Sequence, residues 1–241
     1  MIISHTHKVI FLKARKVAGT SFEIALSKFL GADDVVTPII PGDEKIRTDR
    51  NYVGAQNYQK ETKDIFLHPR WRDVKSLRHF RRPNQFFNHI SAKEVFRTVS
   101  NTLWNEYTKV AIVRNPWDCA ISYFYHYNGR GADLGTFEDW CLNNQFIFGL
   151  NAEQYLIDDK QIVDKFIRYE AFEEDISSLE GNIPELEGLW DTFKSINAKG
   201  GLRVKSGPSV PEIFSHAPKV DALVRAAHAF EIEKFGYALQ P

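Results

Sequence analysis

Residues 13–21, with the sequence KARKVAGTS, bring three cations, a glycine and two hydroxyl groups together within nine positions. Lys16 supplies a full positive charge, and Thr20 and Ser21 supply hydroxyl donors. Gly19 lets the backbone turn sharply and expose its N–H groups. Groups of these kinds bind phosphate and related oxyanions. The stretch therefore predicts an anion-binding turn.

The flanking sequence predicts the elements that would hold this turn. Residues 9–12 form a continuous apolar run, which is typical of a strand buried on both faces. Apolar residues recur at helical spacing from Phe22 to Leu30, so a helix is expected to begin near Gly19. The positive end of that helix would point at a bound anion. An ordinary turn before a helix is the plain alternative.

The turn does not have the pattern of a Walker P-loop. That motif places a lysine directly after its last glycine, whereas Thr20 follows Gly19 here and Lys16 stands three residues before it. A P-loop nucleotide kinase would also need a carboxylate for magnesium. The kinase is therefore an alternative that lacks its characteristic lysine.

Residues 110–123, VAIVRNPWDCAISY, form a second candidate anion site. An apolar strand is expected to end before Arg114, and Pro116 suits the first position of a helix. Ser122 follows Arg114 by eight residues, which is about two helical turns. A guanidinium can donate two parallel hydrogen bonds to a phosphate. The alternative is a strand–turn–helix unit with an exposed arginine.

His89 stands where an expected strand, residues 85–89, would meet an expected helix. Ser91 is suited to cap that helix, with Glu94 three residues on completing a capping box. In open α/β sheets, ligands bind at the rim where strands end. The ordinary imidazole pKa, near 6.5, suits proton transfer at neutral pH. A structural histidine fits the same position.

The two candidate anion sites together resemble those of sulfotransferases, closer to the glycan-modifying and bacterial branch. Residues 16–21 resemble the 5′-phosphosulfate loop, from which Val17 and Ala18 depart, and residues 110–127 resemble the 3′-phosphate motif. The resemblance implies a three-layer P-loop-like fold. It also implies the donor 3′-phosphoadenosine-5′-phosphosulfate (PAPS), transfer of its sulfuryl group to a hydroxyl or amine, and PAP as the product.

The resemblance implies roles for single residues. Lys16 would neutralise charge on the leaving phosphate, and His89 would accept the proton of the acceptor hydroxyl. Arg114 and Ser122 would hold the 3′-phosphate, which distinguishes PAPS from ATP. The arrangement requires no metal. The residues expected to contact the 5′-phosphate and the rest of the nucleotide are Lys13, Lys16, Val17, Ala18, Gly19, Thr20 and Ser21. Arg203, which lies with Lys205 in a glycine-rich loop, is also expected to contact the nucleotide.

The composition limits other classes of function. The chain carries 31 basic and 31 acidic side chains, so no overall charge drives nucleic-acid binding. No apolar run reaches the ~18 residues of a membrane span. Two cysteines make no disulfide framework, and no Cys/His cluster has zinc spacing. We expect a cytoplasmic protein that acts on a small-molecule or glycan acceptor.

Strands that alternate with helices predict an α/β fold with a mainly parallel sheet of four or five strands. We expect one domain over residues 1–241, with a basic insertion at about 40–83. Residues 45–82 hold eleven Lys or Arg against four Asp or Glu, and residues 133–191 hold three against fifteen.

The insertion offers two interpretations. Arg78, Arg81 and Arg82 are interleaved with the aromatic residues Trp71 and Phe80. They could border the acceptor site and attract an anionic or carbohydrate acceptor. Alternatively, they pair with the acidic residues and join two lobes. For the whole chain, a non-catalytic module that binds nucleotides or sulfated glycans is a further alternative.

Overall fold

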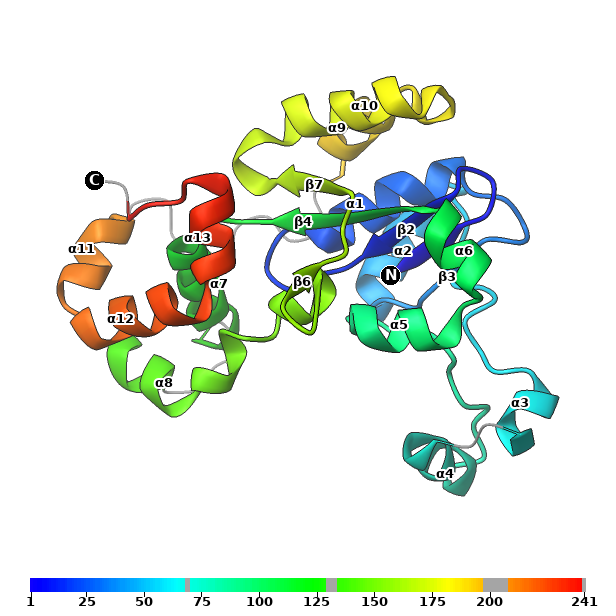
Figure 1. Cartoon of the computed structure of the whole chain (residues 1–241), viewed down its shortest axis with the longest axis horizontal. Coiled ribbons are helices and arrows are strands. Elements are labelled where there is room, and N and C mark those ends of the chain that lie inside the picture. The colour runs from blue at the N-terminus through cyan, green and yellow to red at the C-terminus, as the bar shows by residue number, and fades with distance from the viewer. Residues whose placement is uncertain (68–69, 129–133, 197–207, 240–241) are drawn as a thin grey trace.

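The computed structural model of the chain describes residues 1–67, 70–128, 134–196 and 208–239. A five-stranded sheet lies at its centre, with the strand order β3-β1-β2-β4-β7 (Figure 1). The strands are β1 (Ile2–Ser4), β2 (Val9–Leu12), β3 (Val35–Val36), β4 (Thr108–Val113) and β7 (Lys165–Arg168).

The pairing of the strands confirms the predicted α/β fold. β2 pairs in parallel with β4, and β4 pairs in parallel with β7. Only β1 is reversed, because it runs antiparallel to both β2 and β3. Four of these five strands therefore share one direction. The sequence did not reveal β1, since three residues before a turn carry too little periodicity.

Alternate residues of the central strands enter two different cores. Val9 and Phe11 of β2 pack in one apolar cluster, and Ile10 and Leu12 pack in the other. Successive side chains of a strand point to opposite faces of the sheet, so both faces are covered. The continuous apolar run of β2 is therefore explained by burial on both faces of the sheet, as the sequence predicted.

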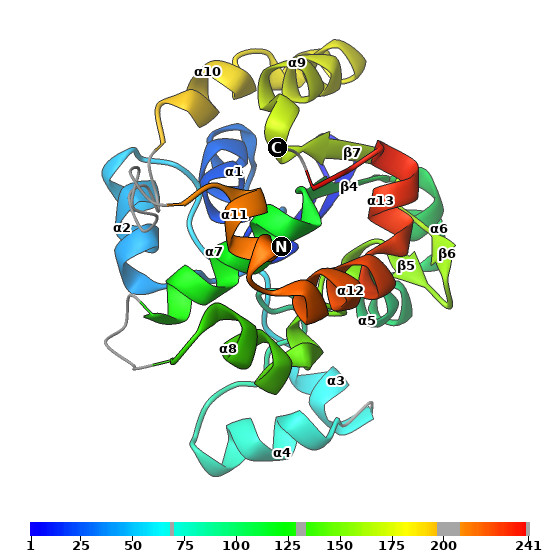
Figure 2. The same ribbon diagram turned by 90° about the vertical axis from the view of Figure 1, so that its left-hand side faces the viewer.

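Helices cover both faces of the sheet (Figures 1 and 2). On one face, α1, α9 and α10 contribute to a single core. On the other face, α5 and α6 contribute Val95 and Trp104. The bounds are α1 (Gly19–Leu26), α5 (Ala92–Thr98), α6 (Asn101–Glu106), α9 (Phe172–Asn182) and α10 (Leu189–Lys194).

A second group of helices lies beyond the ends of β4 and β7 (Figure 1). These helices share a third apolar cluster around Trp117 and Trp140. They are α7 (Pro116–Asn128), α8 (Phe137–Asn143), α11 (Val210–Ser215), α12 (Pro218–Ala227) and α13 (Ala229–Phe235). The described residues also form five short 3₁₀ helices, η1 (Ser27–Phe29), η2 (Gln145–Ile147), η3 (Ala152–Gln154), η4 (Tyr169–Ala171) and η5 (Pro184–Leu186).

One expected strand is absent from the structure. Residues 85–89 form no strand, because the N–H groups of Gln85 and Phe86 both donate to the carbonyl of Tyr58 and the chain then turns. Further along the chain, η3 is followed by β5 (Leu156–Ile157), which pairs with β6 (Lys160–Gln161). His228 lies between α12 and α13.

In the region expected to be a basic insertion, the described residues form α2 (Pro41–Asp49), α3 (Thr62–Leu67) and α4 (Trp71–Arg78). The last two project from the rest of the molecule, and we call residues 61–82 the arm (Figure 1). A buried ion pair between Lys60 and Asp73, 2.5 Å long, ties α4 to the base of the arm.

Candidate functional site

The two predicted anion sites meet at one edge of the sheet. Residues 13–18 connect β2 to α1, and Arg114 directly follows β4. Because β2 and β4 are parallel neighbours, their carboxyl ends lie side by side, where α/β sheets bind ligands. Nη1 of Arg114 donates a hydrogen bond to the carbonyl of Lys16 over 2.8 Å. The motifs are therefore in direct contact.

The backbone of the loop has a shape that suits an anion. Lys16 and Ala18 have positive φ angles of 64° and 58°, whereas Val17 between them has a negative one. Alternation of this kind turns successive N–H groups to one side and forms a concave anion site. Ala18 also precedes the first turn of α1, whose N–H groups lack intrahelical acceptors.

Gly19 is closely packed at the start of α1. A Cβ atom at this position would lie 3.0 Å from Cγ of Lys13. Thr20 and Ser21 follow in the first turn of the helix, the former buried and the latter half-buried. The predicted loop, its glycine and its two hydroxyls therefore all stand at the N-terminus of α1.

Lys13 points into the protein. Its side chain is buried, and Nζ lies 2.5 Å from Oε2 of Glu23. Burial raises the pKa of Glu23, but the charges of Lys13 and of the Met1 amino group and the hydrogen bonds from both together bring that pKa to about 2. The ammonium of Lys13 thus neutralises a buried carboxylate beneath the loop. Its predicted contact with the nucleotide stays a prediction.

Arg114 is held on several sides. Its Nε lies 2.7 Å from Oδ2 of Asp118, one turn along α7, and Nη2 bonds to the same oxygen. The guanidinium also lies over the ring of Tyr169, 4.0 Å from its centre. Burial lowers the pKa of Arg114, but the charge of Asp118, smaller contributions from Cys119 and Tyr169, and the hydrogen bond to Asp118 together raise it by more. Ser122 is half-buried further along α7.

His89 lies beside the same loop, in a turn with a φ angle of 58°. Ser91 caps α5 as predicted, because its Oγ accepts from the N–H of Glu94. The ring atom Nδ1 lies 3.0 Å from the carbonyl of Lys13. A carbonyl only accepts, so Nδ1 carries the hydrogen and Nε2 carries a lone pair. Burial, then the charge of Lys13, lowers the pKa of His89 to about 3.

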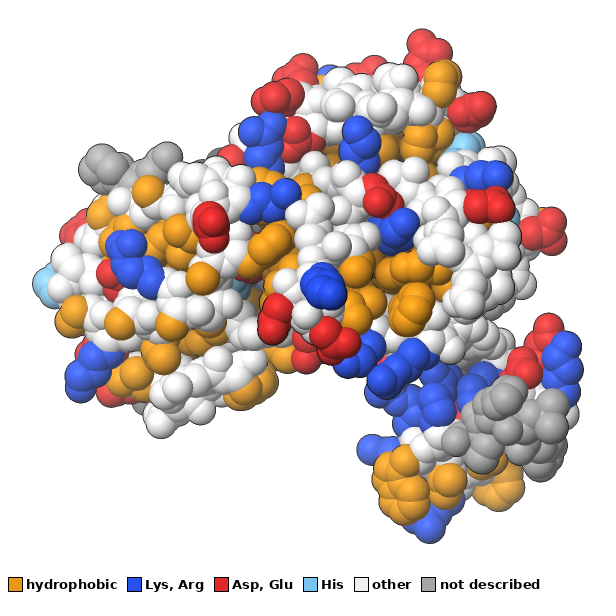
Figure 3. Space-filling model, viewed as in Figure 1, with side chains coloured by type: hydrophobic (Ala, Val, Ile, Leu, Met, Phe, Trp, Pro, Cys, Tyr) orange, Lys and Arg blue, Asp and Glu red, His pale blue; other side chains and the backbone are white. Residues whose placement is uncertain are grey.

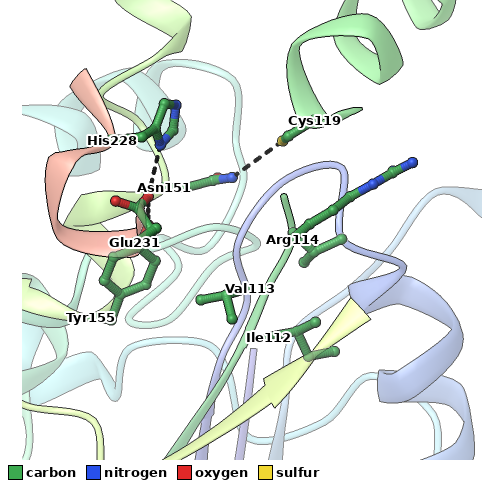
Figure 4. A pocket seen from close by; sticks show the side chains of 9 residues that line it. Ile112, Val113, Arg114, Cys119, Asn151, Tyr155, His228 and Glu231 are labelled. Carbon is green, nitrogen blue, oxygen red and sulfur yellow. Dashed lines mark hydrogen bonds and ion pairs between the residues drawn. The ribbon is translucent and has the colours of Figure 1, made fainter. Parts of the chain in front are cut away.

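Sequence reasoning missed a polar cluster behind the loop (Figure 4). Nδ1 of His228 lies 2.7 Å from Oε1 of Glu231, which also accepts from the hydroxyl of Tyr155. With Asn151 and Arg114, these residues line a cavity of about 10 Å³, enough for about one water molecule. A nucleotide does not fit there. No local pattern marks residues so far apart in sequence.

The remaining predicted site residues lie elsewhere. Arg203 and Lys205 are outside the described residues. Arg78, Arg81 and Arg82 are on the arm, where Nε of Arg82 donates to the carbonyl of Lys60 over 2.6 Å.

Two searches of the described residues returned nothing. In residues 1–67, 70–128, 134–196 and 208–239, no group of three or more His, Cys, Asp or Glu could hold a metal ion. Over the same residues, no helix is long and apolar enough to cross a bilayer.

The sheet, its flanking helices and the loop before α1 define an α/β protein with a P-loop-like fold. The sequence model of the sulfotransferase family matches residues 1–174, and on this match the chain belongs to the sulfotransferase family. The matched part includes the loop, His89 and Arg114 and supports a transferase that moves sulfuryl groups. Comparisons with curated proteins and with solved structures found no match.

Proposed function

We propose that the protein transfers the sulfuryl group of PAPS to a hydroxyl of a carbohydrate or other polar acceptor and releases PAP. The observation that carries this proposal is the hydrogen bond between Arg114 and the Lys16 carbonyl, because it joins two anion-binding elements at one sheet edge. A donor with phosphates at both its 5′ and 3′ positions needs two such elements. In this arrangement Gly19, Thr20 and Ser21 bind the 5′-phosphate.

The 3′-phosphate contacts Arg114 and Ser122. The guanidinium of Arg114 is already engaged by Asp118 and Lys16, so it is pre-oriented, which lowers the entropic cost of binding. Asp118 takes up part of its charge. Binding of the phosphate is therefore shared with Ser122 on α7.

The reaction is an in-line displacement at sulfur, by analogy with phosphoryl transfer. The acceptor oxygen forms a bond to sulfur while the bond from sulfur to the bridging phosphate oxygen breaks. Negative charge develops on that phosphate, and Lys16 together with the loop N–H groups stabilises it. The acceptor proton passes to Nε2 of His89. No metal ion enters this scheme.

His89 has a pKa near 3 without donor, which makes it a weak base. A bound donor brings negative charge beside the imidazole, and an opposite charge raises the pKa of a histidine. Its Nδ1 bond to Lys13 leaves Nε2 as the proton acceptor. The imidazole is therefore in the correct tautomer, and its basicity increases when the donor is bound.

The arm is our candidate for the acceptor-binding surface. The side chain of Trp71 is 87% exposed and that of Phe80 fully exposed, and Figure 3 shows basic and apolar side chains side by side on the arm. Among the described residues, no ion pair joins Arg78, Arg81 or Arg82 to the acidic part of the chain. That absence favours an external anionic or carbohydrate ligand over a link between lobes.

The cellular setting is indicated by the cysteines. Cys119 and Cys141 are both free and buried, which favours a reducing, cytoplasmic setting.

Incubation with radiolabelled PAPS and a panel of glycans, with and without EDTA, tests the function. We expect label transfer that EDTA does not abolish and that Lys16→Ala removes. Transfer from γ-labelled ATP that depends on magnesium would identify a kinase instead. Tight PAP binding without transfer to any acceptor would favour a non-catalytic module.

A further inference from the structure

The carbonyl groups of the loop are held by side chains from three distant parts of the chain. Each holds a different residue of the loop, and each makes a hydrogen bond of 2.8–3.0 Å. The pairs are His89 with Lys13, Asn151 with Arg15, and Arg114 with Lys16.

Asn151 makes two hydrogen bonds to the backbone of a single loop residue. Its Oδ1 accepts from the N–H of Arg15 over 2.8 Å, and its Nδ2 donates to the carbonyl of the same residue over 3.0 Å. The side chain is 6% exposed, so water does not replace these bonds readily. Two bonds to one residue fix the peptide planes on both of its sides. The residue directly after Arg15 is Lys16, the cation of the loop.

The loop needs such support because its conformation is unfavourable by itself. Lys16 and Ala18 both adopt the left-handed region, which residues with a side chain avoid. Strained residues persist only where the surrounding structure determines their conformation. Asn151 holds the residue immediately before this strained segment. It therefore acts on the part of the loop whose N–H groups converge.

We propose that Asn151 is a positioning residue for the 5′-phosphate: it holds the peptide groups of Arg15 so that the N–H groups of residues 16–19 converge before the donor binds. Preorganisation of this kind raises affinity by lowering the cost of ordering. The inference rests on the proposed function, because it takes the anion to be the 5′-phosphate. It adds to the site a residue that lies between η2 and η3.

Calorimetric titration of Asn151→Ala tests the role. Adenosine 3′,5′-bisphosphate engages the loop, whereas adenosine 3′-monophosphate lacks the phosphate that the loop would bind. We expect the variant to lose at least tenfold in affinity for the bisphosphate and less than twofold for the monophosphate. Asn144→Ala is the matched control, because it also removes an amide-to-carbonyl bond, of 2.8 Å to Trp140, away from the loop. Equal losses for both nucleotides would overturn the inference.

A second variant tests the same role if Asn151→Ala does not fold. Asn151→Asp keeps the size and the acceptor but places an oxygen against the Arg15 carbonyl. We expect it to show the same selective loss and, without ligand, faster hydrogen exchange of the amides of residues 15–18. Unchanged exchange and affinity would overturn the inference even if wild-type protein binds PAP. If wild type itself shows no preference for the bisphosphate, the proposed donor is wrong, and unchanged exchange in the variant would still overturn the positioning role.

Discussion

The imidazole of His89 donates a hydrogen bond from Nδ1 to the main-chain carbonyl of Lys13 across 3.0 Å. This bond gives the histidine two separable properties. It braces the loop, and it leaves Nε2 unprotonated for proton transfer. Burial and the charge of Lys13 keep the ring neutral at ordinary pH, because they lower the pKa of His89 to about 3.

The lowered pKa predicts a contribution of His89 to acid sensitivity. Between pH 6.5 and 5 the unfolded chain protonates this histidine, whereas the folded protein keeps it neutral. The unfolded state then binds more protons, so stability falls as the pH falls. His89→Gln should remove about 1.6 kcal/mol of that loss, measured by urea unfolding at both pH values. His79→Gln on the exposed arm is the control, and parallel curves for wild type and His89→Gln would contradict the shift.

Two substitutions of His89 separate its role in holding the loop from its role as a base. Glutamine keeps a donor for the Lys13 carbonyl but accepts no proton, and alanine loses both functions. If His89 is the base, His89→Gln and His89→Ala should both reduce kcat by ~100-fold or more with PAP affinity retained in His89→Gln. A near wild-type rate for His89→Gln would assign the residue to bracing alone.

Arg114 should determine the preference for a 3′-phosphate. In Arg114→Ala, we expect PAP to raise the Tm by no more than AMP does, because the variant lacks the guanidinium that donates two hydrogen bonds to the 3′-phosphate. Arg225→Ala is a close control: it removes another arginine paired with an aspartate four residues away and stacked on an aromatic ring. Retention of the preference in Arg114→Ala would place the 3′-phosphate elsewhere.

Close packing at Gly19 predicts a cost for any side chain there. Gly19→Ala brings Cβ to 3.0 Å from the buried Lys13 side chain, and overpacking costs about 1–3 kcal/mol. Gly181→Ala, in α9 with open space around it, should instead stabilise by about 0.5–1 kcal/mol. Denaturant midpoints measure both. Equal effects of the two substitutions would show that contact with Lys13 is unimportant.

The arm gives a prediction about the acceptor. Arg78→Ala with Arg81→Ala should raise the acceptor KM, most strongly at low salt, and leave the PAP affinity and Tm unchanged. Arg82 is kept in this variant because it bonds to the Lys60 carbonyl. A fall in Tm with an unchanged KM would establish a structural role for the two arginines.

The local parts of the fold and site could be predicted from sequence. The apolar run of β2, the helix from Gly19 and the Arg-Asn-Pro turn each depend on residues close in the chain. The His89 region contacts the loop through the Lys13 carbonyl, but the structure expected for residues 85–89 was wrong. Its apolar residues suggested a strand, whereas Phe86 enters the core from a turn.

Long-range pairings could not be predicted. Asn151 contacts Arg15 across 136 positions, and an isolated asparagine carries no signature. Likewise, nothing near Lys13 showed that its ammonium would turn inward, since the requirement comes from Glu23, which is buried in the next helix. Contacts of this kind depend on how the elements pack rather than on any local pattern.

The chain enters and leaves the arm at one place. Gln59 and Asn84 form a β-bridge, and the N–H of Lys60 donates to the carbonyl of Pro83. The ends of the intervening segment therefore lie side by side. A short turn could replace residues 61–82 without changing the spacing of the elements before and after it. The arm is thus joined to the fold where its two ends meet, and it can be exchanged while the sheet and the loop after β2 keep their positions.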